Sequence, residues 1–196
     1  RQGRTFIALN GDDFDLEELE RQSMMYLIMH EVGHTLGLNH NMKSSSIHSI
    51  SELYDANELK GKAISGSVMD YPALNLNPNP KIKSPYADSS VGHYDKWAIE
   101  FGYKPFKSEQ ERNEILSRST DPLLIFGNDA DILYSSRGID PRVQTNDMSS
   151  DPISYSIDRM QLVNRLFDDI LDKFQMPGNT YEDLRRAFFN LNSQYA

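Results

Sequence analysis

Apolar residues recur at mostly helical spacing in the N-terminal part of the chain, and they predict a helix from about Phe14 to Leu38. The run Asn10–Asp13 before it is a turn and cap signal. Residues Thr5–Leu9, ahead of that turn, predict one short strand. The helix positions that we expect to pack against other parts of the protein are Leu16, Leu19, Met24, Met25, Leu27, Ile28, Met29 and Val32.

The rest of the pattern predicts further helices joined by irregular segments. Residues 41–68 are mixed polar, which indicates an irregular stretch with one short helix, and the proline-rich run 72–85 cannot form a regular element. Helices are predicted at about 95–103, 108–117 and 151–174, and Thr180 caps a final one. The chain is therefore predicted to be mainly α. The last two helices should pair antiparallel through Ile157, Met160, Val163, Phe167, Ile170 and Leu171 on one and Leu184, Ala187, Phe188 and Leu191 on the other.

Three of the five histidines fall within one stretch, HEVGHTLGLNH, at residues 30–40. His30 and His34 are four residues apart on the predicted helix, so they share one face and can bind one metal ion. Zinc in a hydrolytic site usually takes three protein ligands and keeps a position for water or substrate. His40 is the candidate third ligand, because Gly37 can take a positive φ, end the helix and turn the chain back towards the metal.

Glu31 stands beside the first of these histidines. Its carboxylate can take a proton from a zinc-activated water and later hand it to a leaving amine, so its expected role is general base and then general acid.

Three alternatives to this interpretation stay open. A carboxylate some twenty residues further on, Glu52 or Glu58, could replace His40 as the third ligand, although the spacing from Gly37 to His40 argues against that arrangement. The histidines could also be solvated or capping residues of an ordinary helix. Finally, the chain could bind zinc as a module without turnover.

The stretch at residues 30–40 resembles the signature of the metzincin metallopeptidases, which implies a methionine turn downstream. The sequence SVMDYP at residues 67–72 fits that turn, with Met69 as an apolar floor beneath the metal-binding imidazoles. The resemblance also implies that Tyr71 can ligate zinc and then hydrogen-bond the oxyanion, as in astacin-like and serralysin-like enzymes. The alternative for Tyr71 is a rim residue packed beside Pro72. Asn41 differs from the residues that mark the best-known branches, so no branch is assigned.

Together with GHYDKWAIEFGY at residues 92–103 and GIDPR at 138–142, these motifs look like the Met-zincin domain of large secreted bacterial zinc-dependent metalloproteases. That resemblance implies a Zn²⁺-dependent endopeptidase with a protein or peptide substrate, secreted or in the cell envelope. It also implies a metzincin-like lower catalytic subdomain within residues 1–105. The predicted C-terminal helices make residues 106–196 a helical extension, which either packs on the catalytic half or begins the next domain of a longer protein.

Metzincins carry a twisted sheet ahead of the active-site helix, yet only 29 residues precede His30. We therefore expect most of that N-terminal sheet to be missing from this chain, and several apolar residues of the active-site helix to pack against the sheet as well as against the lower half. We also expect the full-length parent to be α+β and this fragment to have weak activity or none.

Composition and charge limit the classes of partner and ligand that we expect for this chain. A net charge of −9 without a cluster of lysine or arginine argues against a nucleic-acid partner, and the lack of cysteine excludes disulfides and thiolate metal ligands.

No apolar run reaches the roughly 18 residues of a membrane span, and no signal-peptide core follows Arg1–Arg4. Residues 128–131, NDAD, lack the spaced ligands of a calcium loop, so we predict a plain turn and no second metal.

Overall fold

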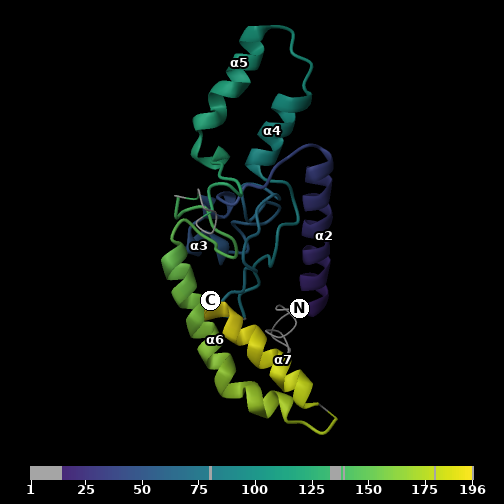
Figure 1. Cartoon of the computed structure of the whole chain (residues 1–196), viewed down its shortest axis with the longest axis vertical. Helices are drawn as coiled ribbons and strands as arrows, with labels where there is room; N and C mark the ends of the chain where they lie inside the picture. The colour runs from purple at the N-terminus through teal and green to yellow at the C-terminus, as the bar shows by residue number, and fades with distance from the viewer. Residues whose placement is uncertain (1–14, 80, 133–137, 139, 179, 196) are drawn as a thin grey trace.

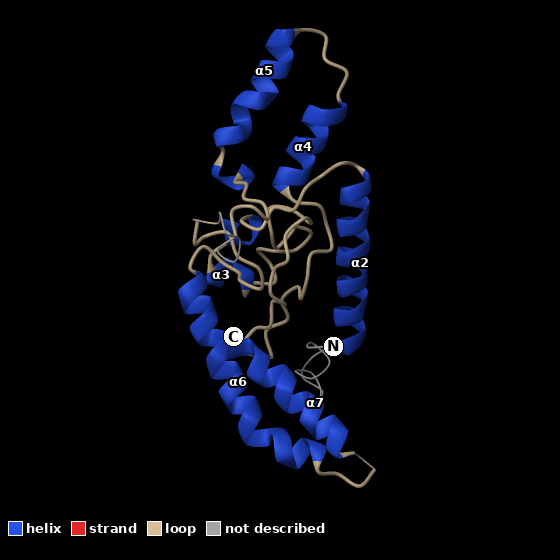
Figure 2. Cartoon of the chain, in the orientation of Figure 1, coloured by secondary structure: helices blue, strands red, loops and turns tan. Residues whose placement is uncertain are grey.

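A computed structural model describes residues 15–79, 81–132, 138, 140–178 and 180–195. The strand expected at residues 5–9 lies outside them. Within the described ranges the regular structure is helical and no strand is present, which agrees with the mainly α prediction (Figure 2). The elements are α2 (Leu16–Thr35), η2 (Ser44–Ile47), α3 (Ile50–Leu53), α4 (His93–Tyr103), α5 (Glu109–Ser117), η3 (Arg118–Thr120), η4 (Pro122–Leu124), α6 (Pro152–Phe174), α7 (Tyr181–Asn192) and η5 (Ser193–Tyr195).

The molecule is elongated, with an irregular central body between two helical pairs (Figure 1). The pair α4 and α5 lies at one end, the pair α6 and α7 lies at the other, and α2 runs along the side of the body. The body consists mainly of the segments 36–92 and 125–151, and 72–79 within it has no helix or strand, as its prolines require.

Helix α2 has the boundaries that its sequence predicts to within a few residues. Asp15 caps its start by accepting a hydrogen bond from the backbone N–H of Glu18 at 3.0 Å. At its end Gly37 has φ +83°, and the backbone N–H groups of Gly37 and Leu38 donate to the carbonyls of His34 and Gly33, each at 3.0 Å. These are the two bonds of a Schellman motif, and they turn the chain out of the helix just before His40.

The described part of the chain covers only some of the apolar positions of α2, and the expected packing of several others against an N-terminal sheet stays a prediction. Leu19 is buried at 4% exposure, but Met24 and Ile28 are each 56% exposed and Val32 is 48% exposed. The buried positions are Leu19, Gln22, His30 and Gly33, so the face with His30 lies against the central body. The apolar spacing identified the helix correctly, but it did not identify the face that the described part of the chain covers.

Buried carboxylates hold the central body together where a sheet ladder would otherwise satisfy the backbone. Asp88 is fully buried and accepts hydrogen bonds from the backbone N–H groups of Ile64 at 2.7 Å and Ser65 at 3.2 Å. Irregular backbone that is buried needs such side-chain partners. An apolar cluster lies beside this network and consists of Leu53, Leu59, Ile64, Met148 and Tyr155.

The two C-terminal helices pair, as predicted, but through a partly different set of side chains. The predicted residues Val163, Ile170, Ala187 and Leu191 are buried, whereas Leu171 is 51% exposed. The buried cluster at this end also takes in α2 and the irregular segment, and its members are Leu19, Leu76, Tyr86, Leu162, Val163, Leu166, Ile170, Ala187 and Leu191.

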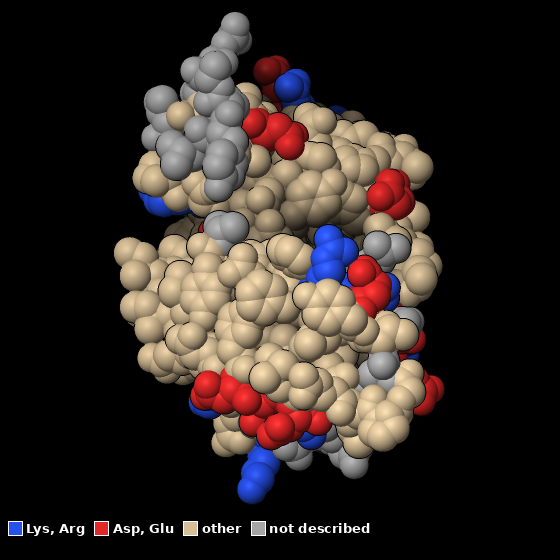
Figure 3. Space-filling view, turned by 60° about the horizontal axis from the view of Figure 1, so that its bottom comes forward, with Lys and Arg blue, Asp and Glu red and all other residues tan. Residues whose placement is uncertain are grey.

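Backbone hydrogen bonds join the first part of the chain to the second. Ala73 N–H donates to the carbonyl of Asp147 at 3.1 Å, and Ser149 N–H donates to that of Ser45 at 3.0 Å. The domain boundary near residue 105 stays a prediction. On the face drawn in Figure 3, acidic side chains gather along one edge and the basic ones are scattered. None of the helices in the described ranges has the length and apolar character needed to cross a membrane.

Candidate metal centre

The three histidines of residues 30–40 lie together beside the central body. One nitrogen of each can be chosen so that all three atoms lie within 4.8 Å of one another. The ring centroid of His30 lies 4.8 Å from that of His34 and 5.4 Å from that of His40. His30 is buried, His40 is half-buried and His34 is exposed, so the cluster opens to solvent on one side.

Each of these imidazoles has its Nδ1 atom beside an oxygen acceptor. The partner of His30 is the carbonyl of Val68 at 2.8 Å, and that of His34 is the carbonyl of Leu38 at 3.2 Å. His40 Nδ1 lies 3.0 Å from both carboxylate oxygens of Asp129. A carbonyl or carboxylate can only accept, so each Nδ1 carries the proton and each Nε2 keeps its lone pair.

The environment of His30 fits a metal ligand. Its Nε2 atom is buried and has no hydrogen-bond partner in the described structure. Burial lowers the pKa of His30, which favours the neutral ring that a metal requires. A bound metal ion would satisfy this nitrogen, and three neutral imidazoles are a donor set that zinc accepts.

The SVMDYP segment forms a tight turn beneath the His30 ring. Met69 is fully buried, and a Cβ built on Gly33 of α2 would lie 2.3 Å from its sulfur, so the methionine packs directly against the helix between the two histidines. Asp95 of α4 fixes the turn by accepting hydrogen bonds from Ser67 Oγ at 2.5 Å and from Val68 N–H at 2.9 Å. The carbonyl of Val68 is thereby held in place to accept from His30.

Asp70, the next residue of this turn, ties it to the segment that follows His40. Its carboxylate accepts hydrogen bonds from Ser44 Oγ at 2.9 Å and from the backbone N–H groups of Ser45 and Tyr71, each at 2.7 Å. Burial raises the pKa of this carboxyl to about 7.

Tyr71 faces the histidine cluster. Its hydroxyl lies 3.0 Å from His40 Nε2, to which it donates because His40 Nδ1 carries the proton. Partial burial, together with the nearby carboxylates Glu31 and Asp129, raises the pKa of Tyr71 and keeps it protonated near neutral pH. Glu31 itself is exposed, next to His30 on α2.

Glu52 and Glu58, the alternative third ligands, have other roles. Glu52 accepts from the backbone N–H of Ser49 at 2.7 Å in the capping box of α3. Glu58 pairs with Lys62 at 3.3 Å. Within the described part of the chain, the group with metal-ligand geometry consists of His30, His34 and His40.

Sequence reasoning missed Asp129 and the two turn-fixing carboxylates Asp70 and Asp95. Residues 129–131 do form a turn, as expected, but the side chain of Asp129 reaches a histidine 89 positions away. Asp95 stands within GHYDKW, a motif that carries the family resemblance, whereas nothing in the sequence near Asp129 signals its contact with His40.

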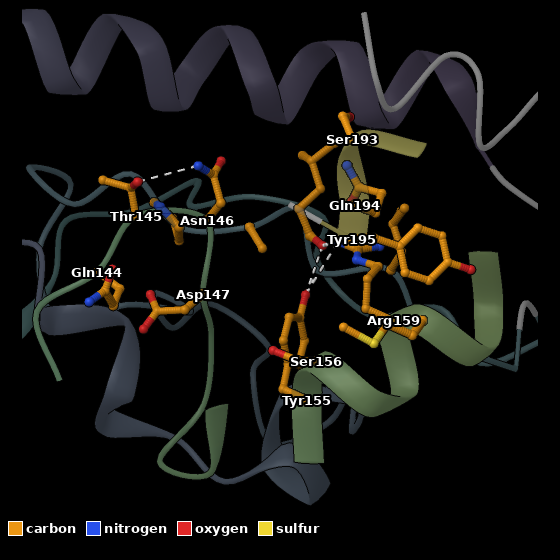
Figure 4. Close-up of a pocket in the computed structure, with 15 residues that line it drawn as sticks. Gln144, Thr145, Asn146, Asp147, Tyr155, Ser156, Arg159, Ser193, Gln194 and Tyr195 are labelled. Carbon is orange, nitrogen blue, oxygen red and sulfur yellow. Dashed lines mark hydrogen bonds between the residues drawn. The ribbon is translucent and has the colours of Figure 1, made fainter. Parts of the chain in front are cut away.

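A pocket of about 450 Å³ begins directly after Tyr71 (Figure 4). Its walls are the segments 72–74 and 144–147 together with α6 and η5, and Tyr155 and Arg159 project from α6 into it. Asn146, which has φ +63°, joins the second wall to the site by donating its N–H to the carbonyl of Tyr71 at 2.8 Å. The pocket is therefore mainly polar, and its lining starts at the residue after Tyr71 without including any of the three histidines.

A family model described as Met-zincin matches residues 12–196 of this chain. No curated protein and no solved structure gives a match.

Proposed function

Because the chain belongs to the Met-zincin family, we propose that it is a zinc-dependent endopeptidase whose metal is held by His30, His34 and His40. The observation that carries this proposal is the clustering of three histidines whose Nδ1 atoms all have acceptors, which leaves the Nε2 side of each ring to a shared ion, with the Nε2 of His40 accepting from the Tyr71 hydroxyl in the metal-free chain. The buried and unpartnered Nε2 of His30 supports it independently.

Zinc at this site would polarise the scissile carbonyl and lower the pKa of water towards neutrality. Glu31, exposed beside His30, accepts the proton of the attacking water and then delivers it to the nitrogen of the leaving amine. Met69 supports the His30 side of the cluster through its contact with Gly33.

Tyr71 is proposed to stabilise the oxyanion. Its hydroxyl now donates to His40 Nε2, and once that nitrogen binds metal the hydroxyl becomes available to another acceptor next to it. A neutral phenol suits this role, because its proton is the one donated to the developing charge.

The substrate is proposed to be a protein or peptide, and the pocket that follows Tyr71 is the candidate place for one of its side chains. Secretion or location in the cell envelope is proposed on the family resemblance alone.

Zinc content of the purified chain, measured by elemental analysis, tests the ligand set. About one zinc ion per chain is expected, lost in His40→Ala and retained in Glu58→Ala. Zinc lost in Glu58→Ala and retained in His40→Ala would favour a carboxylate third ligand. Failure of the unmutated chain to bind zinc would refute the proposed site.

Casein cleavage by the same samples tests the chemistry. Glu31→Gln should keep zinc and lose cleavage by about 10²–10⁴-fold, the usual contribution of general acid–base catalysis. Weak cleavage is expected of this fragment, and a zinc-loaded chain that cleaves no better than Glu31→Gln would show that the fragment is a zinc-binding module without turnover.

A further inference from the structure

We propose that Asp129 is a positioning residue for the metal site, which fixes the tautomer and ring orientation of His40 by accepting its Nδ1 proton. The consequence for metal binding rests on the proposed zinc function, whereas the tautomer can be examined without metal.

His40 differs from the other two histidines in how it is held. His30 and His34 lie within α2, so the helix backbone sets their spacing. His40 follows the end of that helix, and its Nδ1 partner is a side chain 89 positions away, whose two oxygens both lie at 3.0 Å. The orientation of the third imidazole therefore depends on a long-range contact.

The loop that carries Asp129 is fastened to the residues directly after His40. Asn41 is fully buried, and its amide donates to the carbonyl of Ile125 at 2.9 Å and accepts from Gly127 N–H at 3.1 Å. Met42 N–H donates to the carbonyl of Gly127 at 2.7 Å. The third histidine and its carboxylate are thus held at a fixed separation by their own neighbours, which gives Asn41 a physical role.

The turn itself aims the carboxylate. Ala130 N–H donates to Asn128 Oδ1 at 2.8 Å, and Asn128 N–H donates to Asp131 Oδ2 at 3.0 Å. Asp131 therefore stabilises the turn, while the Asp129 side chain reaches His40.

Orientation, more than charge, is the expected effect of Asp129. Its side chain is 64% exposed, so water screens its attraction to a cation. Its position nevertheless requires the proton of His40 on Nδ1, which leaves Nε2 as an acceptor for Tyr71 or a metal. A carboxylate that orients a ligating imidazole typically changes metal affinity by about 10–100-fold.

The first test reads the tautomer of His40 in the metal-free chain from imidazole ¹⁵N chemical shifts, at about pH 8 where a free histidine is neutral. In the unmutated chain and in the control Asp172→Ala, which removes an exposed carboxylate of α6, the Nδ1–H form of His40 should dominate. In Asp129→Ala, the Nε2–H form should become the major one. An unchanged Nδ1–H form in Asp129→Ala would overturn the proposal, and a loss of folding by that variant would move the same comparison to Asp129→Leu, which has a similar shape and no acceptor.

The second test measures zinc affinity by competition with a chromophoric chelator. Asp129→Ala should bind zinc about 10–100-fold more weakly than the unmutated chain, while the control Asp172→Ala should stay within about threefold. Equal affinities for Asp129→Ala and the parent would refute the positioning role. If the parent binds no zinc, the proposed function fails, and the metal-free tautomer still decides whether Asp129 orients His40.

Discussion

Gly33 allows Met69 of the turn to pack directly against the helix that carries the histidines. A Cβ built there would lie 2.3 Å from Met69 Sδ and 3.6 Å from its Cγ and Cε atoms. Since carbon and sulfur atoms pack at no less than about 3.5 Å, Gly33→Ala would force the sulfur to move by about 1 Å. Met69 is fully buried, so that movement must displace neighbouring atoms.

The cost of Gly33→Ala follows from two opposing effects. Overpacking a buried site usually costs about 1–3 kcal/mol. Replacing glycine by alanine within a helix returns about 1 kcal/mol. We therefore expect a net loss of about 1 kcal/mol in the free energy of unfolding. Zinc affinity should also fall, because Val68, the neighbour of Met69, provides the carbonyl that orients His30.

Urea unfolding of four variants checks this prediction. Gly102→Ala in α4 is the matched control, since a Cβ there meets nothing within 4 Å, and it should leave stability unchanged or raise it by up to about 1 kcal/mol. Met69→Ala alone should cost about 2–5 kcal/mol. The double variant Gly33→Ala/Met69→Ala should be more stable than the sum of the single losses by about 1–3 kcal/mol. The reasoning is refuted if Gly33→Ala behaves like Gly102→Ala and shows no coupling to Met69.

Three further predictions concern pH, the C-terminal helices and the metal. Hydrogen bonds from Arg142 and the nearby Lys43 hold the pKa of Asp140 below its usual 3.8, so its stabilisation is present above that pH and is lost as pH falls through the folded-state pKa. Asp140→Asn should therefore lower the melting temperature at neutral pH, through a loss of less than about 1 kcal/mol in the free energy of unfolding. The difference in melting temperature between the variant and the unmutated chain should shrink below about pH 4, and an equal difference at neutral pH and below pH 4 would contradict this. Leu191→Ala in α7 removes a fully buried side chain and should cost about 2–5 kcal/mol in urea unfolding, and a loss below about 1 kcal/mol would show that this helix pair is loosely packed. Zinc at about 100 times its Kd should stabilise the parent by about 2.7 kcal/mol in thermal unfolding and leave His34→Ala unaffected.

The parts of the site that were predictable from the sequence are those whose geometry is local. The spacing of His30 and His34 fixes them on one helix face, and Gly37 has the positive φ that the turn towards His40 requires. Met69 could be named through the family resemblance, but its contact with Gly33 follows only from the folded structure.

The apolar face of α2 shows where pattern reasoning stops. Spacing identifies which side chains share a helix face. It does not indicate which part of the protein covers that face, because the spacing is the same in every case. Met24 and Ile28 are exposed, whereas the polar residue Gln22 is buried because its side-chain oxygen accepts from the backbone N–H groups of Tyr86 and Ala87 at 2.7 and 3.1 Å. Hydrophobicity alone could not indicate that the buried side of this helix is partly polar.

Asp129 shows the same limit within the site. Reading residues 128–131 as a turn was sound, because the side chains of Asn128 and Asp131 do form its hydrogen bonds. The Asp129 carboxylate contacts His40 because Asn41 holds the loop of Asp129 in place through hydrogen bonds to Ile125 and Gly127. A sequence motif can thus name three ligands, but the orientation of the third depends on residues that no spacing rule connects to it. Zinc affinity should accordingly be sensitive to both Asn41 and Asp129, although neither residue belongs to the ligand set and Asp129 lies 89 positions from His40.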